Sequence, residues 1–484
     1  MTEQTHSLEH YPFRVGLLGL GLEAYWAQFD GLKPRLERYL EVVNSNIANS
    51  ASRSVVNFGL VDNHAKTIAV SHQCREKDID ILLVHITTYA LSALLLPIIL
   101  HARVPVLLLN LQPESSIDYG TFNRMGSRTE MTAEWLAYCS SCPVPEIANV
   151  LRRLEIPFHQ LTGRLHDDPE CWQSVEQWLR AAEVKHTLSH SRLGLMGHYY
   201  SGMLDIATDL VQISGRFGTH IEMLEVDRLS ALRRTVTPQQ IANKIAEFRY
   251  FFAIDDDCEE PELQRSARTA VALDLFVAEN SLDLMAYYYM GSGISENEDT
   301  MSSIILGTSM LTASGVPVAG EYEIKNVLAM KILHELGAGG SFTEFYAMDF
   351  NDDLVLMGHD GPGHAGIAQD KIRVRPLKVY HGKVGRGLSV EMAVKHGPVT
   401  LLSVVEDRAK GFSLLVAEGE SVAGPILEIG NTNSRYRFSL GAHAFVEAWN
   451  DRGPAHHCAI GTGLQARQIQ KLAELMNLGF HQVC

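Results

Sequence analysis

Short apolar runs alternate with longer helical patterns through the first 110 residues of the chain. Runs of continuous apolar residues fit strands that are covered on both faces, as in a parallel sheet flanked by helices. This alternation favours a doubly wound α/β domain, because each crossover helix must pack back onto the sheet. The expected strands lie at 13–20, 54–61, 79–86 and 104–110, with helices at 31–47 and 63–77.

The same alternation restarts after a polar stretch at 163–190 that contains Asp and Pro residues. Residues 193–196 and 220–224 have the composition of strands, and a helical pattern at 203–213 lies between them. A second α/β domain is therefore expected to begin near residue 191.

From about residue 350 the pattern changes to short β-type runs separated by turn residues, which is typical of an antiparallel sheet or barrel. A helix at 463–476 is expected to close the chain. The predicted fold class is α/β, with two doubly wound, Rossmann-like domains at 1–190 and 191–338 and a β-rich, barrel-like C-terminal domain at 339–484. Its expected strands lie at 372–376, 377–381, 388–392, 399–405 and 412–416.

Charge and length narrow the range of partners. The chain has 484 residues, enough for two or three domains, and its formal net charge is −16. A negative field of this size repels nucleic acids and anionic membrane surfaces, and no dense Lys/Arg run offsets it. We therefore expect a small-molecule substrate, with neither nucleic acid nor membrane as a partner.

Cysteine usage and the N-terminus favour a cytoplasmic protein. Seven scattered cysteines, an odd and sparse set, fit reduced thiols and not a disulfide framework. The first residues lack the basic and apolar regions of a signal peptide. The stretch between Asp80 and Arg103 has no charged residue, as a membrane-spanning helix would, but a buried strand followed by a helix accounts for this composition better.

A glycine-rich segment follows the first expected strand. Residues 19–24 fit the GxGxxA pattern of dinucleotide-binding loops. The acidic residue expected about twenty residues later is absent, since Asp62 comes 38 residues after Ala24, and Trp26 and Phe29 crowd the helix start. A structural turn is favoured over a nicotinamide site, and no dinucleotide cofactor is expected.

Four potential metal ligands lie in the C-terminal part of the chain. They are two carboxylates, Glu321 and Glu344, and two imidazoles, His359 and His457. A mixed oxygen and nitrogen set suits a divalent ion such as Mn²⁺, with positions left for substrate oxygens.

Each of these residues also has a structural interpretation. Glu321 precedes an expected helix at 322–336, where capping would explain it. Glu344 lies between bulky apolar residues, where its charge needs a metal or an arginine. His364 is a competing ligand in the loop after His359. One histidine of the 456–457 pair could bind a metal while the other hydrogen-bonds beside it.

The order of these segments resembles the metal-site segments of the L-arabinose isomerase family. They are Gly-Glu-Tyr-Glu at 320–323, Ser-Phe-Thr-Glu-Phe-Tyr at 341–346, Asp-Leu-Val-Leu-Met-Gly-His at 353–359 and Gly-Pro-Ala-His-His at 453–457. The resemblance covers most of the chain, because that family and the related L-fucose isomerases have two α/β domains followed by a β-rich domain.

The resemblance implies a site and an assembly. It assigns the metal to Glu321, Glu344, His359 and the second histidine of the pair, His457. The metal would be Mn²⁺, or another divalent ion such as Co²⁺ or Mg²⁺. It also implies a homo-oligomer, a trimer or hexamer, with sites completed by a neighbouring subunit.

The segments expected to contact the sugar depart from the family. The Gly-Ser-Gln-His type loop after the first strand is replaced by Gly-Leu-Gly-Leu-Glu-Ala-Tyr at 19–25, and Ser127 stands where the family has a histidine. The Cys-Pro pair that usually follows the metal histidine is absent, and the loop contains His364 instead. Ser127, His456 and His364 are the candidate substrate-binding residues.

The leading hypothesis is a metal-dependent aldose–ketose isomerase that acts on a free sugar such as L-arabinose, forming L-ribulose, or on a related pentose or hexose. Glu321 and Glu344 would be the acid and base of a cis-enediol route, while a hydride shift would use the same ligands. The alternatives are a metal-dependent epimerase of the same fold and a non-catalytic sugar-binding protein.

Overall fold

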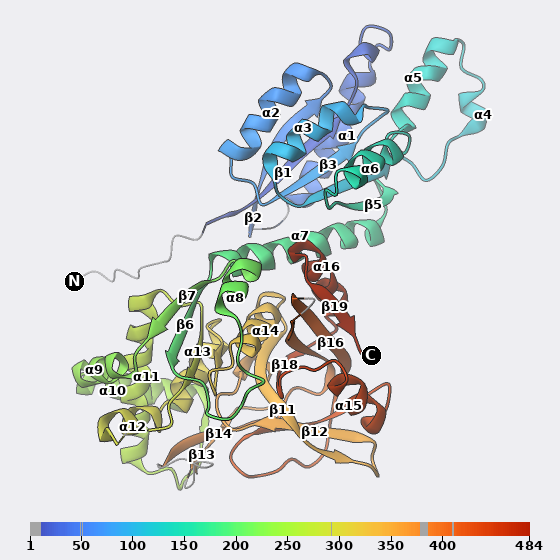
Figure 1. Ribbon diagram of the computed structural model, residues 1–484. Helices are drawn as coiled ribbons and strands as arrows, with labels where there is room; N and C mark the ends of the chain where they lie inside the picture. The colour runs from blue at the N-terminus through green and yellow to red at the C-terminus, as the bar shows by residue number, and fades with distance from the viewer. Residues whose placement is uncertain (1–10, 49, 51, 292, 378–385, 409–410) are drawn as a thin grey trace. The chain divides into compact units, whose positions relative to one another are not determined.

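The computed structural model describes residues 11–48, 50, 52–291, 293–377, 386–408 and 411–484 (Figure 1). Residue contacts divide the chain into two compact units, one of them Glu9–His186 and the larger one including Thr187–Cys484. The larger unit contains both a parallel sheet and an antiparallel sheet. The three-domain division expected from the sequence stays a prediction.

A five-stranded parallel sheet forms the core of the first unit, in the order β2-β1-β3-β4-β5. Helix α3 contacts both α2 and α6 in one layer, and α1 contacts α5 in another, so the expected doubly wound arrangement is confirmed. The strands are β1 Phe13–Leu20, β2 Arg53–Val61, β3 Ile81–Ile86, β4 Val106–Gln112 and β5 His159–Arg164. The helices are α1 Leu32–Ile47, α2 His64–Glu76, α3 Ser92–Ala102, α4 Tyr119–Phe122, α5 Arg128–Tyr138, α6 Val144–Arg153 and α7 Pro169–His190, which reaches into the second unit.

The turn after β1 is closed by Trp26. Its ring lies 3.1 Å from the place where a Cβ on Gly21 would stand. Its Nε1–H donates a hydrogen bond of 2.9 Å to Asp62, at the end of β2. The glycine at position 21 therefore lets an indole ring pack directly on the backbone, which gives the glycine-rich segment a structural role.

A four-stranded parallel sheet opens the second unit, in the order β10-β9-β6-β7. Because the strands are parallel, the loops that follow β6, β9 and β10 leave from the same edge of the sheet. The strands are β6 Arg192–Gly197, β7 His220–Leu224, β9 Leu284–Tyr288 and β10 Val318–Ala319. The helices are α8 Leu210–Phe217, α9 Val226–Thr235, α10 Pro238–Phe251, α11 Glu260–Asn280, α12 Ser295–Met301, α13 Ile305–Ala313 and α14 Ile324–Glu335.

Six antiparallel strands then close into a barrel, in the order β15-β18-β11-β12-β17-β16 and back to β15. Closure pairs the outer strands of the sheet with each other and confirms the expected barrel-like domain. The strands are β11 Gly339–Asp349, β12 Leu354–His359, β15 Gly397–Asp407, β16 Gly411–Val422, β17 Thr432–Phe438 and β18 His457–Thr462. Strand β19, Gly479–Gln482, pairs with β16. A separate three-stranded sheet has the order β14-β13-β8, with β14 at Gly387–Glu391, β13 at Arg373–Leu377 and β8 at Ala253–Ile254. The remaining helices are α15 Ala442–Asn450 and α16 Ala466–Met476.

The helix expected at 203–213 is wrong in position, because α8 begins only at Leu210. The Asp209 side chain accepts hydrogen bonds from the backbone N–H groups of Val211 and Gln212 at 2.8 and 3.2 Å, which fixes the helix start. Residues before it form a loop that includes Gly202 at φ +96°. This loop after β6 later contributes to the functional site.

The ends of α14, α16 and β13 differ in part from those expected from the sequence. The helix expected at 322–336 is α14, so Glu321 lies before its first turn and does not cap it directly. Gly337 follows α14 at φ +78°, as predicted for a helix stop. The helix expected to close the chain is α16, but β19 follows it. The strand expected at 377–381 lies outside the described residues, apart from Leu377 at the end of β13.

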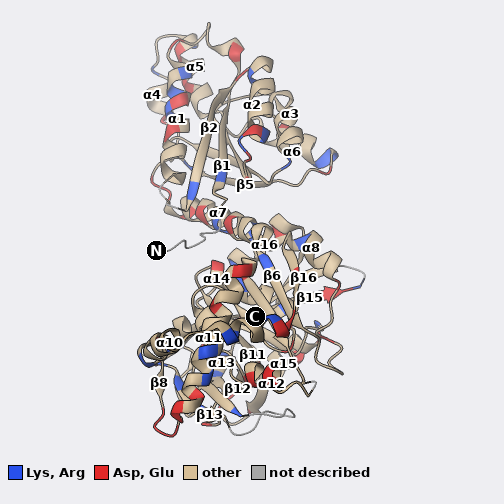
Figure 2. Ribbon diagram, turned by 90° about the vertical axis from the view of Figure 1, so that its left-hand side faces the viewer, with Lys and Arg blue, Asp and Glu red and all other residues tan. Residues whose placement is uncertain are grey.

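The uncharged stretch between Asp80 and Arg103 folds as β3 and the short helix α3. Among the described residues, no helix is long and apolar enough to cross a membrane. Figure 2 shows Lys and Arg interspersed with Asp and Glu over the helices and loops of both units.

Replacing Gly358 with alanine tests the packing of β12 against β17. A Cβ at this position would lie 2.0 Å from the backbone oxygen of Thr432. We expect Gly358→Ala to lower the free energy of unfolding by about 1–3 kcal/mol, measured by urea denaturation. Gly215→Ala in α8, where a Cβ meets nothing within 4 Å, is the matched control and should not destabilise. An unchanged midpoint for Gly358→Ala would contradict the β12–β17 register.

Candidate metal and substrate site

Strand register brings three of the four expected ligands together. Glu344 of β11 lies directly opposite His457 of β18 and, on its other side, opposite Gly358 of β12. Directly opposite residues in an antiparallel pair have Cβ atoms about 4.5–5.5 Å apart. His359 follows Gly358 as the last residue of β12. His457 is the first residue of β18.

The ligand atoms form two overlapping groups around His457. Glu344, His359 and His457 offer atoms that all lie within 4.8 Å of one another. Glu321, His456 and His457 form a second such group within the same limit. The structure therefore gathers all four residues expected to bind the metal, and it adds His456 beside Glu321.

The two imidazoles are held by specific contacts. His359 Nδ1 donates to the backbone oxygen of Asp360, so the tautomer is fixed and Nε2 is the nitrogen that carries the lone pair. The Phe342 ring packs edge-on against His359 at 4.3 Å and lies 4.4 Å from the His457 ring, measured between centroids. One aromatic side chain therefore limits the orientation of both histidines.

Glu321 reaches the site through an unusual backbone turn. It follows β10, and both Glu321 and Tyr322 adopt positive φ, at +57° and +64°. Non-glycine residues adopt this conformation only when the surrounding structure holds it, at an energy of about 1–3 kcal/mol each. The Tyr322 N–H donates to the Tyr287 carbonyl at 3.0 Å and the Glu323 N–H donates to that of Gly320 at 3.0 Å. These bonds hold the turn that presents Glu321.

Glu323 is a site residue that the sequence interpretation missed. Its side chain is fully buried, and its Oε2 lies 3.5 Å from His457 Nδ1. Burial raises the pKa of Glu323 to about 8. A carboxyl group behind a histidine is the usual way to orient a metal ligand. The Glu-x-Glu spacing at 321–323 was the available signal, but only the fold shows that the second carboxyl faces His457.

His457 has the properties of a ligand in its neutral form. Burial, followed by the neighbouring His456, lowers the pKa of His457 to about 3. Its Nε2 lies 3.4 Å from Glu321 Oε2 and is buried without a hydrogen-bond partner in the described part of the chain. A buried nitrogen of this kind is satisfied by a cation, so the residues present fit a divalent ion bound by oxygen and imidazole donors.

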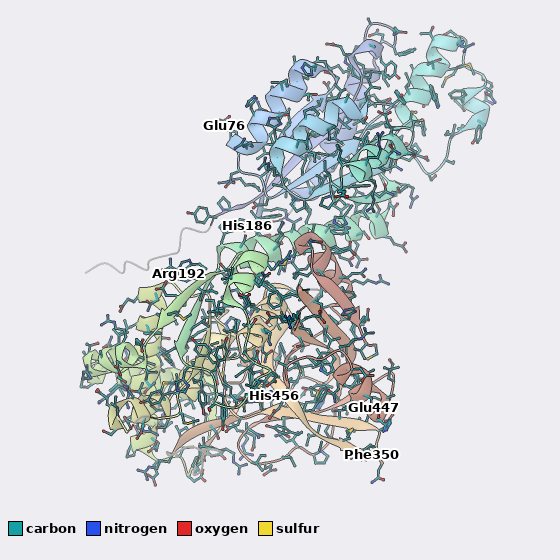
Figure 3. The ribbon with its side chains drawn as sticks, in the orientation of Figure 1. Glu76, His186, Arg192, Phe350, Glu447 and His456 are labelled. Carbon is teal, nitrogen blue, oxygen red and sulfur yellow. The ribbon has the colours of Figure 1, made fainter. Side chains whose placement is uncertain are left out.

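His456 is anchored by Asp205 from the loop after β6. Its backbone N–H and its Nδ1 meet Asp205 Oδ2 at 2.9 and 2.6 Å. This hydrogen bond lowers the pKa of Asp205 in spite of the opposing effect of partial burial. Figure 3 shows His456 in the larger unit. Its Nε2 lies 3.9 Å from Glu321 Oε2, so His456 borders the ligand groups.

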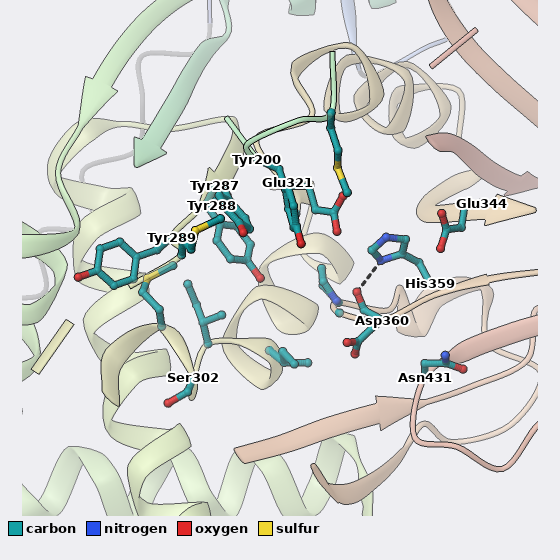
Figure 4. A pocket seen from close by; sticks show the side chains of 18 of the residues that line it. Tyr200, Tyr287, Tyr288, Tyr289, Ser302, Glu321, Glu344, His359, Asp360 and Asn431 are labelled. Carbon is teal, nitrogen blue, oxygen red and sulfur yellow. Dashed lines mark hydrogen bonds between the residues drawn. The ribbon is translucent and has the colours of Figure 1, made fainter. Parts of the chain in front are cut away.

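A cavity of about 630 Å³ adjoins these ligands. It lies between the carboxyl edge of the parallel sheet, which supplies loops after β6, β9 and β10, and the barrel strands β11 and β12. This is the edge where open α/β sheets bind ligands. Figure 4 shows the tyrosines at 200 and 287–289 apart from Glu344, His359, Asp360 and Asn431. The size is typical of small-molecule sites.

Two predicted substrate-binding residues lie elsewhere in the fold. Ser127 caps α5 in the first unit, where its hydroxyl accepts the Glu130 N–H at 3.1 Å. His364 is buried next to His334, with 6.1 Å between ring centroids, and its Nδ1 accepts the Gly366 N–H. Neither is among the described residues that line the cavity. Their contacts with substrate stay predictions.

Comparison with known proteins concerns mainly the barrel. Residues 339–479 match the family model of the L-arabinose isomerase C-terminal domain. This match begins at the first residue of β11 and includes Glu344, His359 and His457.

Similarity to curated proteins extends further along the chain. This chain is 23% identical to the L-arabinose isomerase of Nocardioides over 351 residues. The match covers 68% of this chain and 67% of that protein. The chain is 22% identical to the Aeromonas salmonicida L-arabinose isomerase, with the same coverage of 68% and 67%. The Saccharophagus degradans L-arabinose isomerase is 24% identical and covers 62% of this chain and 61% of its own length.

A solved structure, a putative transcriptional regulator from Clostridium difficile 630, matches with a TM-score of 0.15 and 12% identity. The match covers 69% of this chain and 94% of that one. A score this low carries no information about the fold.

The buried His364 gives a test of the site's surroundings by pH. Burial, followed by His334, lowers the pKa of His364 to about 4, whereas an unfolded histidine titrates near 6.5. Below about pH 6.5 the unfolded chain binds a proton that the folded chain does not, so stability falls as the pH falls from 6.5 toward 4.

We expect metal-free wild-type protein to lose about 1–2 kcal/mol more unfolding free energy between pH 7 and pH 5 than His364→Asn does. Asparagine keeps an acceptor for the Gly366 N–H but does not titrate. Urea denaturation at both pH values measures the difference. Equal losses in the two proteins would show that His364 titrates normally in the folded state.

Proposed function

We propose that the chain is a metal-dependent aldose–ketose isomerase that acts on a free sugar, such as L-arabinose or a related pentose or hexose. The main support is that Glu344, His359 and His457 lie close together. Glu321 forms a second group with the same His457. The relatives named L-arabinose isomerase support the reaction class.

Glu321, Glu344, His359 and His457 would hold the divalent ion, with Mn²⁺ the first candidate and Co²⁺ or Mg²⁺ the others. When bound, such an ion supplies positive charge that stabilises charge developing on the sugar's O1 and O2. Glu323 and Phe342 keep the two imidazoles in the ligand orientation. Tyr200 and Tyr287–Tyr289 line the neighbouring part of the cavity.

The carboxylates of Glu321 and Glu344 both line the cavity and are the proposed acid and base. One takes the proton from C2 of the open-chain aldose while the other, in its protonated form, gives a proton to O1, and a cis-enediol forms. The first carboxyl then gives its proton to C1 while the second, now ionised, takes the proton from O2, so that the ketose forms without net change in atoms. Glu321 is restrained by its backbone turn and Glu344 by the strand pairs on both sides, which keeps both carboxylates in place during transfer.

The proposal includes a homo-oligomer, a trimer or hexamer, in the cytoplasm. An epimerase of the same fold would use the same ligands and carboxylates. A sugar-binding protein would use the cavity alone. Product analysis distinguishes the three.

The decisive experiment is a panel of free aldoses incubated with purified protein, scored for ketose formation with Mn²⁺ and after chelation. We expect ketose from at least one pentose or hexose only when the divalent ion is present. Turnover that survives chelation would contradict the metal role. Epimeric aldose as the sole product would favour the epimerase, and binding of sugars without turnover would favour the binding protein.

Glu344→Gln tests the acid/base assignment. The amide keeps an oxygen for the metal but cannot exchange the proton, so we expect kcat to fall by about 10²–10⁴-fold while Mn²⁺ still binds. Metal content is measured on the same preparation. Glu447→Gln on α15 makes the same change of charge at an exposed position (Figure 3) and should leave kcat unchanged. Wild-type kcat in Glu344→Gln would overturn the assignment.

A further inference from the structure

The cavity extends well beyond the ligand groups. Its volume is about 630 Å³, and cavities of about 300–1,000 Å³ bury most of the surface of drug-sized molecules, which are larger than a free pentose. Figure 4 shows Tyr289 and Ser302 on the side of the cavity away from Glu344 and His359. If O1 and O2 of a sugar lie at the ligand groups, space therefore remains beyond the other end of its carbon chain.

We call the part of the cavity around Tyr289 and Ser302 the remote end. Met290 follows Tyr289 directly in the chain and Met301 precedes Ser302, and all four line the cavity together with Glu298. A tyrosine ring and two thioether side chains pack well against apolar groups and aromatic rings. Between the remote end and the ligand groups, the cavity continues along further tyrosines, including Tyr200 and Tyr288.

The two polar side chains of the remote end have structural partners within the protein. Glu298 Oε1 accepts the Gly293 N–H at 3.1 Å. The Ser302 hydroxyl accepts a hydrogen bond of 2.8 Å from Arg265 and donates one of 3.3 Å to the Asp299 carbonyl. These bonds hold the wall in place, so neither side chain depends on a polar ligand group for its hydrogen bonding.

Charge at the remote end disfavours an anionic ligand group. Among the described residues that line the cavity, none is lysine or arginine. Arg265 binds Ser302, but its guanidinium is paired with Glu262 at 2.7 Å and with Asp299 at 3.2 Å. A phosphate or carboxylate at this end would therefore meet the Glu298 carboxylate without a counter-charge from the wall.

The mouth of the cavity is apolar as well. Met290, Leu427 and Ile429 line the cavity and are 47%, 43% and 61% exposed. They come from two segments far apart in the sequence, the one after β9 and the one between β16 and β17. Large apolar side chains that stay exposed around one opening mark a place where an apolar group of a ligand or partner binds.

We propose that the substrate is a free sugar that carries an apolar or aromatic group on the last carbon of its chain, such as an aryl ether or ester of the terminal hydroxyl. This inference rests on the proposed function, since it takes the ligand groups as the place of O1 and O2. The sugar part lies between the ligand groups and the tyrosines. The substituent packs against Tyr289, Met290 and Met301 at the remote end.

Binding of non-reacting polyols tests the proposal without turnover. The probes are L-arabinitol, ribitol and xylitol, each compared with its O5-benzyl ether and its O5-glyceryl ether by calorimetric titration into Mn²⁺-loaded protein. In at least one series we expect the benzyl ether to bind about tenfold or more tightly than the parent polyol, because its ring leaves water. The glyceryl ether, which is longer but polar, should bind within about threefold of the parent.

Three results would overturn the proposal at this stage. An equal gain from the benzyl and glyceryl ethers would show that length, and not apolar character, is recognised. No gain from any benzyl ether is the result expected if a second copy of the chain covers the mouth. A benzyl ether that binds as tightly after chelation of the metal would show that the ring binds independently of the ligand groups.

Met290→Gln is the matched variant, since Met290 is half-exposed and its replacement leaves the core intact. We expect it to reduce the preference for the benzyl ether over the parent polyol to about threefold or less. Met348→Gln makes the same change at a residue of β11 that is 40% exposed and does not line the cavity, and it should keep the full preference. A preference that persists in Met290→Gln, or that falls equally in Met348→Gln, contradicts the proposal.

The outcomes separate this inference from the proposed isomerase. If a plain aldose is isomerised but the benzyl ethers give no gain, the inference fails and the isomerase stands. If a benzyl ether binds through Met290 but neither plain nor benzylated aldoses give ketose, the isomerase fails. In that case the cavity is a binding site for polyols with an apolar substituent.

Discussion

The pairing of β18, β11 and β12 is the constraint on which the site depends. Glu344 has a fixed partner on each side, His457 on β18 and Gly358 on β12. A one-residue slip in either pair would send every following side chain of that strand to the opposite face. Barrel closure pairs the outer strands with each other and opposes such slips. Backbone hydrogen bonds between strands therefore fix the positions of three of the proposed ligands, Glu344, His359 and His457.

The fourth proposed ligand, Glu321, is positioned in a different way. Glu321 stands at the carboxyl edge of a parallel sheet, where strand ends and helix starts leave room for side chains from several loops. The same edge supplies the tyrosines at the end of β9 and the loop after β6. The cavity thus has Glu344 and His359 on its barrel side, and the tyrosines of the β6 and β9 ends together with Glu321 on its sheet side.

Sequence patterns predicted the elements better than their contacts. Continuous apolar runs predicted β1 and β3 because both strands are buried almost throughout. The position of α8 was missed, since the apolar pattern at 203–213 belongs partly to a loop and the Asp209 cap decides the start. The four proposed metal ligands were identified from four short segments. Glu323 and Asp205 were not, because their roles depend on burial behind His457 and on a contact across more than 200 residues of sequence.

The sequence by itself determined the alternation of strand and helix, the change to short antiparallel strands, and the supply of carboxylate and imidazole groups in a recognisable order. These are local properties, readable from the spacing and chemistry of neighbouring residues. Tertiary structure decided which of the candidate residues meet. His456 and His457 are adjacent in the chain, yet one is exposed and bound to Asp205 while the other is buried between Glu321 and Glu323. Strand register and burial make that distinction, and both depend on residues far away in the sequence.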